Sequence, residues 1–147
     1  MRAPVLILIN FLMIFALGAC GSNEAPAPAA TVRLAGAPGR PASGYLTLRI
    51  EGDRGALVSV TSPQAGRIEM HETMSEGTMS AMRAIERIPV RDGVTLSFEP
   101  GGRHLMLFDV DSAVHAGGRI DLVLNFERGA PVTLAAEVVA PGDHVGH

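Results

Sequence analysis

From about residue 31 to residue 140 the chain is a succession of short segments in which apolar and polar residues alternate. In "GYLTLRI" every second residue is a large aliphatic one, which is the period of a β-strand with one buried face. The segments are separated by turn-forming sequences such as "GDRG", "SEGT", "AGG" and "RGAP". No segment is convincing as a helix. The pattern predicts an all-β domain, an antiparallel sandwich or barrel of eight or nine short strands.

Residues 1–19 have a different character. Arg2 precedes the apolar run "PVLILINFLMIFALGA" and then Cys20, a pattern typical of a secretory signal peptide and short for a comfortable membrane span. The end of the run, "LGAC", resembles the lipobox of bacterial lipoproteins, in which the cysteine receives the lipid. Because Cys20 is the only cysteine and has no disulfide partner, we expect lipidation. The alternative is an unused thiol beside an ordinary cleavage site.

The remaining chain has room for one domain. Residues 20–30 read as a Pro/Ala-rich tether, residues 31–141 as the folded domain and residues 142–147 as a flexible tail. Gly21 after the cysteine indicates the outer membrane if the cell is Gram-negative, with the lipid as the only membrane contact. The formal net charge is −3 at pH 7, which gives no basic footprint for nucleic acid.

Methionine is distributed unevenly. After the leader, all five methionines fall between residues 70 and 106, within "MHETMSEGTMSAM" and "RHLMLF", and both segments contain a histidine. Methionine is ordinarily an adaptable apolar residue of the core, and a core would spread such residues along the chain. The clustering with His71 and His104 therefore indicates a role for the sulfur.

The predicted strands bring these side chains together. His104 and Met106 are two residues apart, so they leave the same face of one strand. His71 and Met82 lie on the two arms of a predicted hairpin, "RIEMHET" and "MSAMRAIERI". If the strand with "HLM" lies near that hairpin, two imidazoles and two thioethers converge.

This set of donors favours one metal. Thioether sulfur is soft and neutral and selects Cu(I), whereas Zn(II) usually draws on thiolate, imidazole and carboxylate. Cu(II) prefers tetragonal nitrogen and oxygen ligands. The sequence thus predicts a Cu(I) site at His71, Met82, His104 and Met106. For Met74 and Met79 we expect packing at the turn or the rim of the site instead.

The spacing of these four residues also resembles a known signature. The pattern is His71, ten residues, Met82, twenty-one residues, His104, one residue and Met106. It resembles that of the PCuAC family of periplasmic copper chaperones, and "YLTL", "SPQAGRIEMHE", "PGGRHLMLFD" and "LVLNFERG" resemble family segments in the same order. The resemblance implies a cupredoxin-like, Greek-key fold and a protein that is not an enzyme. It also implies a chaperone that delivers Cu(I) from an envelope donor to an acceptor, by family the copper centre of cytochrome c oxidase.

Two departures from the family pattern concern additional copper contacts. Members often carry a methionine two residues before the second ligand, where this chain has Ser80 and a displaced Met79. Some members have a His/Met-rich extension thought to hold Cu(II). Here the tail offers only His144 and His147, which could form a weak second copper site or be ordinary polar residues. His115 falls in a predicted turn and is expected to be solvated.

Two other functions are alternatives to this one. A copper-dependent electron carrier or redox protein of the blue-copper type needs a cysteine thiolate among its equatorial ligands, and Cys20 is committed to the lipobox. A metal-free adhesion or scaffold lipoprotein stays open.

Overall fold

A computed structural model describes residues 29–145 of the chain, and this part contains ten strands and no helix. The strands are β1 (Ala29–Arg33), β2 (Ala42–Arg49), β3 (Ala56–Thr61), β4 (Ala65–Glu76), β5 (Met79–Ile85), β6 (Ile88–Pro89), β7 (Thr95–Phe98), β8 (Arg103–Val110), β9 (Arg119–Phe126) and β10 (Val132–Val139). The predicted all-β class is confirmed. No helix that could cross a membrane is present among these residues.

The strand count exceeds the predicted eight or nine because β1 and β6 are separate strands. The sequence predicts one strand over "MSAMRAIERI". The chain instead leaves β5 at Ile85, and Ile88 starts β6 beside β3. Ile88 is buried and Ile85 packs against the core. These two residues are three apart, so they could not share one face of a continuous strand. The other addition, β1, begins at Ala29, two residues before the expected start of the domain.

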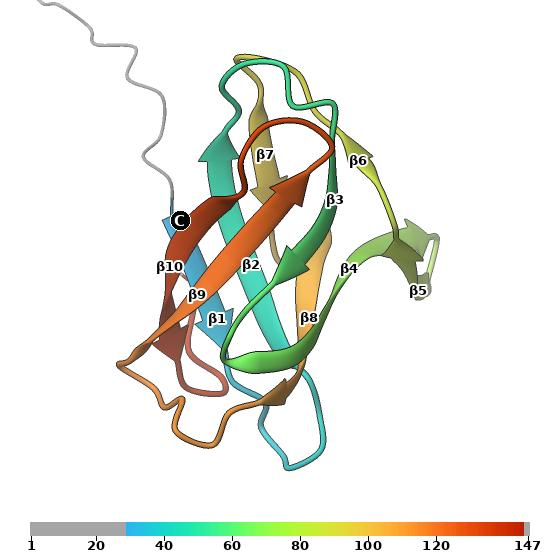
Figure 1. Cartoon of the computed structure of the whole chain (residues 1–147). Coiled ribbons are helices and arrows are strands. Elements are labelled where there is room, and N and C mark those ends of the chain that lie inside the picture. Colours follow the sequence, from blue (N-terminus) through green and yellow to red (C-terminus); the bar gives the residue numbers. More distant parts are fainter. Residues whose placement is uncertain (1–28, 146–147) are drawn as a thin grey trace, which may run out of the picture.

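The strands form one hydrogen-bonded path that folds over itself into two layers (Figure 1). The order along the path is β5-β4-β8-β2-β1-β10-β9-β3-β6, and β7 pairs with the second half of β2. One pair, β1 with β10, is parallel. The prediction of antiparallel strands therefore holds for the other pairs and not for this one. In Figure 1, β9, β10 and β3 lie in front of β1, β2 and β8.

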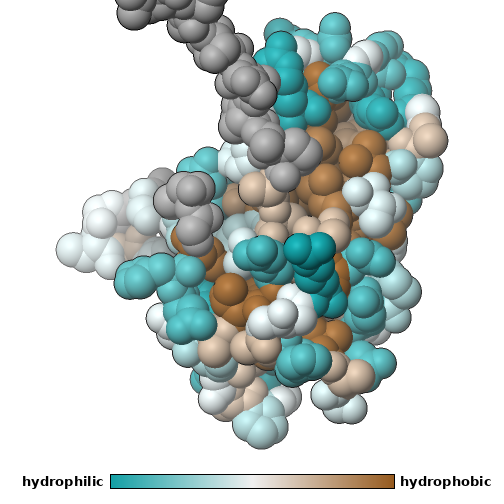
Figure 2. All heavy atoms as spheres, turned by 90° about the vertical axis from the view of Figure 1, so that its left-hand side faces the viewer, coloured by the Kyte–Doolittle hydropathy of each residue, from teal (hydrophilic) through white to brown (hydrophobic). Residues whose placement is uncertain are grey.

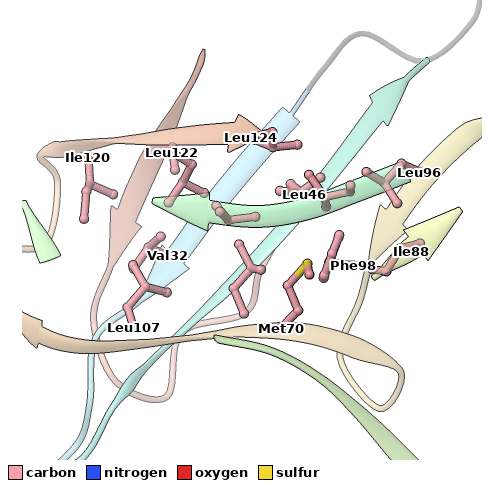
Figure 3. Close-up of a cluster of buried hydrophobic side chains, with 14 of the residues drawn as sticks. Val32, Leu46, Met70, Ile88, Leu96, Phe98, Leu107, Ile120, Leu122 and Leu124 are labelled. Carbon is pink, nitrogen blue, oxygen red and sulfur yellow. The ribbon is translucent and has the colours of Figure 1, made fainter. Parts of the chain in front are cut away.

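The core fills the space between the layers (Figure 3). Figure 3 shows aliphatic side chains from β9 facing those of β4 and β8, with Phe98 and Met70 side by side. On β8, Leu105 and Leu107 are fully buried. Burying each such side chain stabilises the fold by about 1.5–3 kcal/mol, so the inward face of β8 is strongly determined.

The β4–β5 hairpin extends away from the body of the domain (Figure 1). Its turn contains Gly77 with φ of +60°, a left-handed conformation that glycine adopts without steric cost. The strand β5 is at the end of the sheet path and is mostly exposed. Three of the five exposed large hydrophobic side chains in the described chain are methionines of this hairpin: Met74, Met79 and Met82.

The opposite side of the molecule has a different surface. Figure 2 shows this side, where apolar atoms lie in a strip between polar flanks. The hydrophobic side chains of β10, such as Val132 and Leu134, are only partly exposed and pack against the core. Among residues 29–145, the exposed methionines are therefore those of the hairpin.

Candidate metal centre

The antiparallel register of β4 and β8 sets the two histidines opposite each other. His71 of β4 pairs with His104 of β8, and Glu69 pairs with Met106. Directly paired residues project to the same face of a sheet, and so do residues two apart. His71, His104 and Met106 therefore share one face, together with Glu69.

The opposite face of these two strands is the core. Met70 and Leu105 form the neighbouring pair in the register, and both are buried. Their burial fixes which way the alternating side chains point, because a slip of one residue would turn the histidines inward. This is why "MHE" and "HLM" present their imidazoles outward.

Met82 reaches the same face from the other side of β4. It pairs with Thr73, and Ala84 pairs with His71. Met82 is thus a diagonal neighbour of His71, at a typical Cα separation of about 7–8 Å. Its side chain is 60% exposed, whereas Met106 is half-buried. The fold brings His71, His104 and Met106 into a compact group and leaves Met82 at the edge.

The two imidazole rings are close but not stacked. Their centroids are 6.0 Å apart and their planes are tilted by 39°. His104 is 8% exposed and the side chain of His71 is 16% exposed. Both rings are therefore largely shielded from water. We call the cluster of His71, His104, Met106 and Met82 on this outward face the nest.

A backbone contact orients His104. Its Nδ1 lies 3.2 Å from the carbonyl oxygen of Gly102. A carbonyl only accepts hydrogen bonds, so Nδ1 carries the proton and donates it. The lone pair is then on Nε2, which can bind a metal. Such outer contacts commonly fix the tautomer of a ligand histidine.

A side-chain contact orients His71, and it involves Nε2, whereas the contact of His104 involves Nδ1. Nε2 of His71 lies 2.9 Å from Oε2 of Glu69. The hydrogen bond with His71, ahead of the charge of Arg67, holds the pKa of the Glu69 carboxyl below its ordinary value. Glu69 is therefore an acceptor at neutral pH, and the ring of His71 is oriented with Nε2 toward this carboxylate.

His71 Nδ1 is the one buried side-chain nitrogen or oxygen atom without a hydrogen-bond partner in the described part of the chain. An unpaired buried polar atom costs about 1–3 kcal/mol. Such an atom calls for an explanation, and a bound ligand or ion is one. The donor set beside it fits a soft metal ion.

The other methionines have different positions. Met70 belongs to the core. Met74 and Met79 are on the opposite face of the hairpin from Met82, because Met74 pairs with Ala81 and Met79 with Glu76. They are 44% and 76% exposed. Of the two expected positions, they therefore lie beside the turn at Gly77 and not at the rim of the site.

The remaining predicted positions lie away from the nest or outside the described residues. His115 is exposed and its Nδ1 is 2.9 Å from the carbonyl oxygen of Ala113, as expected for a turn. His144 follows the last strand. Cys20 and His147 lie outside the described residues, as does the predicted signal peptide. In residues 29–145 no three His, Cys, Asp or Glu side chains form a group that could hold a metal ion.

Sequence reasoning overlooked Glu69 and its partner Arg67. Both precede His71 on the same strand face, at intervals of two residues. The alternation of "RIEMH" was sufficient to place them there. Their ion pair and the contact of Glu69 with His71 depend on side-chain conformations, which the alternation does not predict.

Comparison with known proteins agrees with this architecture. A family described as "Putative lipoprotein LpqE-like" matches residues 26–138. "Putative lipoprotein Lxx21020" of Leifsonia xyli subsp. xyli is 34% identical over 85 residues, which are 56% of this chain and 50% of that protein. "Uncharacterized protein RP573" of Rickettsia prowazekii is 28% identical over 72 residues, 48% of this chain and 40% of that protein. The chain spans half or less of the length of these curated relatives.

Two solved structures have a similar fold. The copper-bound PCuAC domain from PmoF2 superposes with a TM-score of 0.59 at 25% identity, covering 78% of this chain and 92% of that domain. The Cu(I) form of DR1885 from Deinococcus radiodurans gives 0.58 at 27% identity, covering 82% and 83%. The cupredoxin-like fold implied by the family resemblance is confirmed. The chain belongs to the LpqE-like family and is a PCuAC-type protein.

Proposed function

We propose that this protein binds Cu(I) through His71, His104, Met106 and Met82 and passes it to an acceptor in the cell envelope. The observation that carries the proposal is the register that sets His71 opposite His104 on the face that also carries Met106. Support comes from the buried, unpartnered Nδ1 of His71. Two similar structures contain copper, and one of them is named as a Cu(I) form.

The chemistry of the four donors favours Cu(I). Imidazole and thioether are neutral, and a site of this kind leaves the charge of the ion uncompensated by its direct ligands. Thioethers discriminate in favour of Cu(I) against harder ions. A roughly tetrahedral arrangement suits a closed-shell ion that imposes no geometry of its own, in contrast to the tetragonal preference of Cu(II).

Delivery requires that the ion can leave. Met82 is on the outermost strand of the sheet and is 60% exposed, so an incoming donor can approach from its side. We infer that the acceptor's thiolate or imidazole replaces the Met82 thioether first. The ion would then move stepwise while His71 and His104 still hold it.

Our proposal for the location rests on the sequence, and our proposal for the acceptor rests on the family resemblance. The lipobox-like "LGAC" supports an anchor at Cys20, and the family is described as lipoproteins. We place the protein at the periplasmic face of a membrane, the outer membrane if the cell is Gram-negative. By family resemblance the acceptor is the copper centre of cytochrome c oxidase.

A copper-dependent electron carrier is the second candidate. It finds no support in the nest, because Cys20 is the only cysteine in the sequence and precedes the folded domain. An enzymatic role likewise has no candidate nucleophile in the nest. A metal-free envelope lipoprotein would not explain why Nδ1 of His71 is buried without a hydrogen-bond partner.

The test is a Cu(I) titration of the apo-protein in competition with a chromogenic chelator. One equivalent of Cu(I) should be retained by the native protein. The variant H71A/H104A should lose it, and H115A, which removes an exposed histidine outside the nest, should keep it. Absence of Cu(I) retention in the native protein would refute the proposal, as would equal retention in all three.

A further inference from the structure

A line of three side chains on β4 leads to His71. Arg67, Glu69 and His71 are spaced by two residues and share one face of the strand. Arg67 Nη1 donates to Oε1 of Glu69, and the other oxygen of Glu69 lies 2.9 Å from His71 Nε2. The carboxylate is thus held from one side while it contacts the imidazole on the other.

Arg67 is itself held in place. It pairs in register with Phe108 of β8, and its guanidinium carbon lies 4.1 Å from the centre of the Phe108 ring. A guanidinium over an aromatic face at this distance is attracted by the ring. Phe108, Arg67 and Glu69 therefore form a chain of contacts that ends on one nitrogen of His71.

We propose that Glu69 is a positioning residue that fixes the tautomer of His71, so that Nδ1 and not Nε2 carries the lone pair. A neutral imidazole has one donor nitrogen and one acceptor nitrogen. A carboxylate can only accept, so it retains the proton on Nε2. The consequence for copper rests on the function proposed above, whereas the tautomer is a property of the apo-protein.

The inference explains an asymmetry in the nest. His104 keeps its proton on Nδ1 through the Gly102 carbonyl, and His71 keeps its proton on Nε2 through Glu69. The two histidines would therefore bind through different nitrogen atoms. Each ring would be locked by a different kind of acceptor, one from the backbone and one from a side chain.

The chain offers a closely matched control. Glu72 lies on the same strand and its side chain is 29% exposed, against 31% for Glu69. It also contacts arginines, Arg83 at 3.2 Å and Arg103 at 3.8 Å. It differs in pointing to the opposite face, away from the imidazoles. Loss of Glu72 removes a carboxylate of similar exposure and leaves the contact between Glu69 and His71 in place.

The first measurement is a long-range proton–nitrogen correlation spectrum of the ¹⁵N-labelled apo-protein at a pH of about 8, where an ordinary imidazole is neutral. The native protein and E72A should show His71 protonated at Nε2 alone. E69A should show a mixture of both tautomers, and E69Q, whose amide oxygen can still accept, should lie between them. A His71 protonated at Nδ1 in the native protein, or unchanged in E69A, would overturn the proposal.

The second measurement is Cu(I) affinity by chelator competition. Loss of an outer-sphere partner of this kind typically weakens metal binding about 10–100-fold. We expect such a loss for E69A, a smaller one for E69Q and less than about threefold for E72A. Equal losses in E69A and E72A would contradict the positioning role. If the native protein bound no Cu(I), the proposed function would fail, and the spectra would still decide the tautomer.

Discussion

His71 and His104 face each other across the β4–β8 pair, with 6.0 Å between their ring centroids. The register that creates this relationship is the register that buries Met70 against Leu105 on the other face. A shift by one residue would exchange the two faces and place imidazoles in the core. The hydrophobic core therefore fixes the face on which the two histidines meet.

The first prediction separates sulfur chemistry from packing. Leucine and methionine have similar volumes, so M106L and M74L should each cost the fold less than about 1.5 kcal/mol. M106L removes a thioether beside His104, and we expect Cu(I) affinity to fall at least about tenfold, which is about 1.4 kcal/mol. M74L changes a residue on the opposite face and should bind Cu(I) normally.

Chelator competition and apo-state melting temperatures would check this pair. Equal Cu(I) affinities would mean that the methionines serve packing only. A fall in both variants would show that Met74 is also a ligand.

The second prediction concerns the anchor. Inhibition of lipoprotein signal peptidase with globomycin should cause a precursor to accumulate, because cleavage before Cys20 would follow lipid attachment. C20S should release a soluble protein from the membrane fraction. Fractionation and mass spectrometry of the mature N-terminus would check both. A native protein that is soluble and unmodified would refute the lipobox interpretation.

The third prediction concerns the tail. Residues 142–147 follow β10, which ends at Val139, and the four predicted ligands are all upstream. Removing the tail should leave Cu(I) affinity nearly unchanged, and any lost copper uptake should be of Cu(II). The variant H144A/H147A, which keeps the length of the chain, is the control. A large loss of Cu(I) affinity in either protein would show that the site is misplaced.

Much of the fold was predictable because the alternation of apolar and polar residues along a strand shows which side chains are buried. The outward direction of His104 and Met106 followed from "HLM", since Leu105 and Leu107 had to be inside. The pairing of β1 with β10 was not predictable, because parallel neighbours distant in sequence leave no local signal. The break between Ile85 and Ile88 was missed for a related reason: both are apolar, and only the packed core shows that they belong to different strands.

The candidate site was predictable in its residues and less so in its organisation. Spacing brought His71 and Met82 to one hairpin, but the register that makes them diagonal neighbours depends on the turn at Gly77. The contact between Glu69 and His71 depends on side-chain rotamers, and so does the exposure of Met82. These are the features that bear on metal exchange.

The fourth prediction concerns stability and pH. Arg87 donates to both carboxylate oxygens of Glu127, at 2.6 and 3.1 Å, and these hydrogen bonds hold the pKa of Glu127 below its ordinary value. A carboxyl with a depressed pKa in the folded state stabilises the protein above its unfolded pKa, about 4.3 for glutamate, and this contribution is lost as the pH falls through the folded pKa.

The R87Q variant should therefore melt below the native protein at neutral pH, and the difference should shrink below a pH of about 4. Melting temperatures from pH 7 to pH 3 would check this. In an E127Q background, R87Q should have no pH-dependent effect. A difference between R87Q and the native protein that is constant over the whole range would contradict the assignment to Glu127.

The last prediction addresses delivery. Met82 is the exposed member of the proposed ligand set, and Met79 is a still more exposed methionine on the same strand but the opposite face. Replacing either by leucine should leave the melting temperature of the apo-protein nearly unchanged, since neither side chain is buried. M82L should release Cu(I) to a competing chelator about tenfold faster, equivalent to about 1.4 kcal/mol of lost ligation, whereas M79L should release it at the native rate. Stopped-flow transfer to a chromogenic chelator would measure both rates. Equal rates in M82L and the native protein would show that the ion leaves by a route that does not begin at Met82. Faster release in M79L would show that the face of the hairpin opposite to Met82 takes part in the transfer.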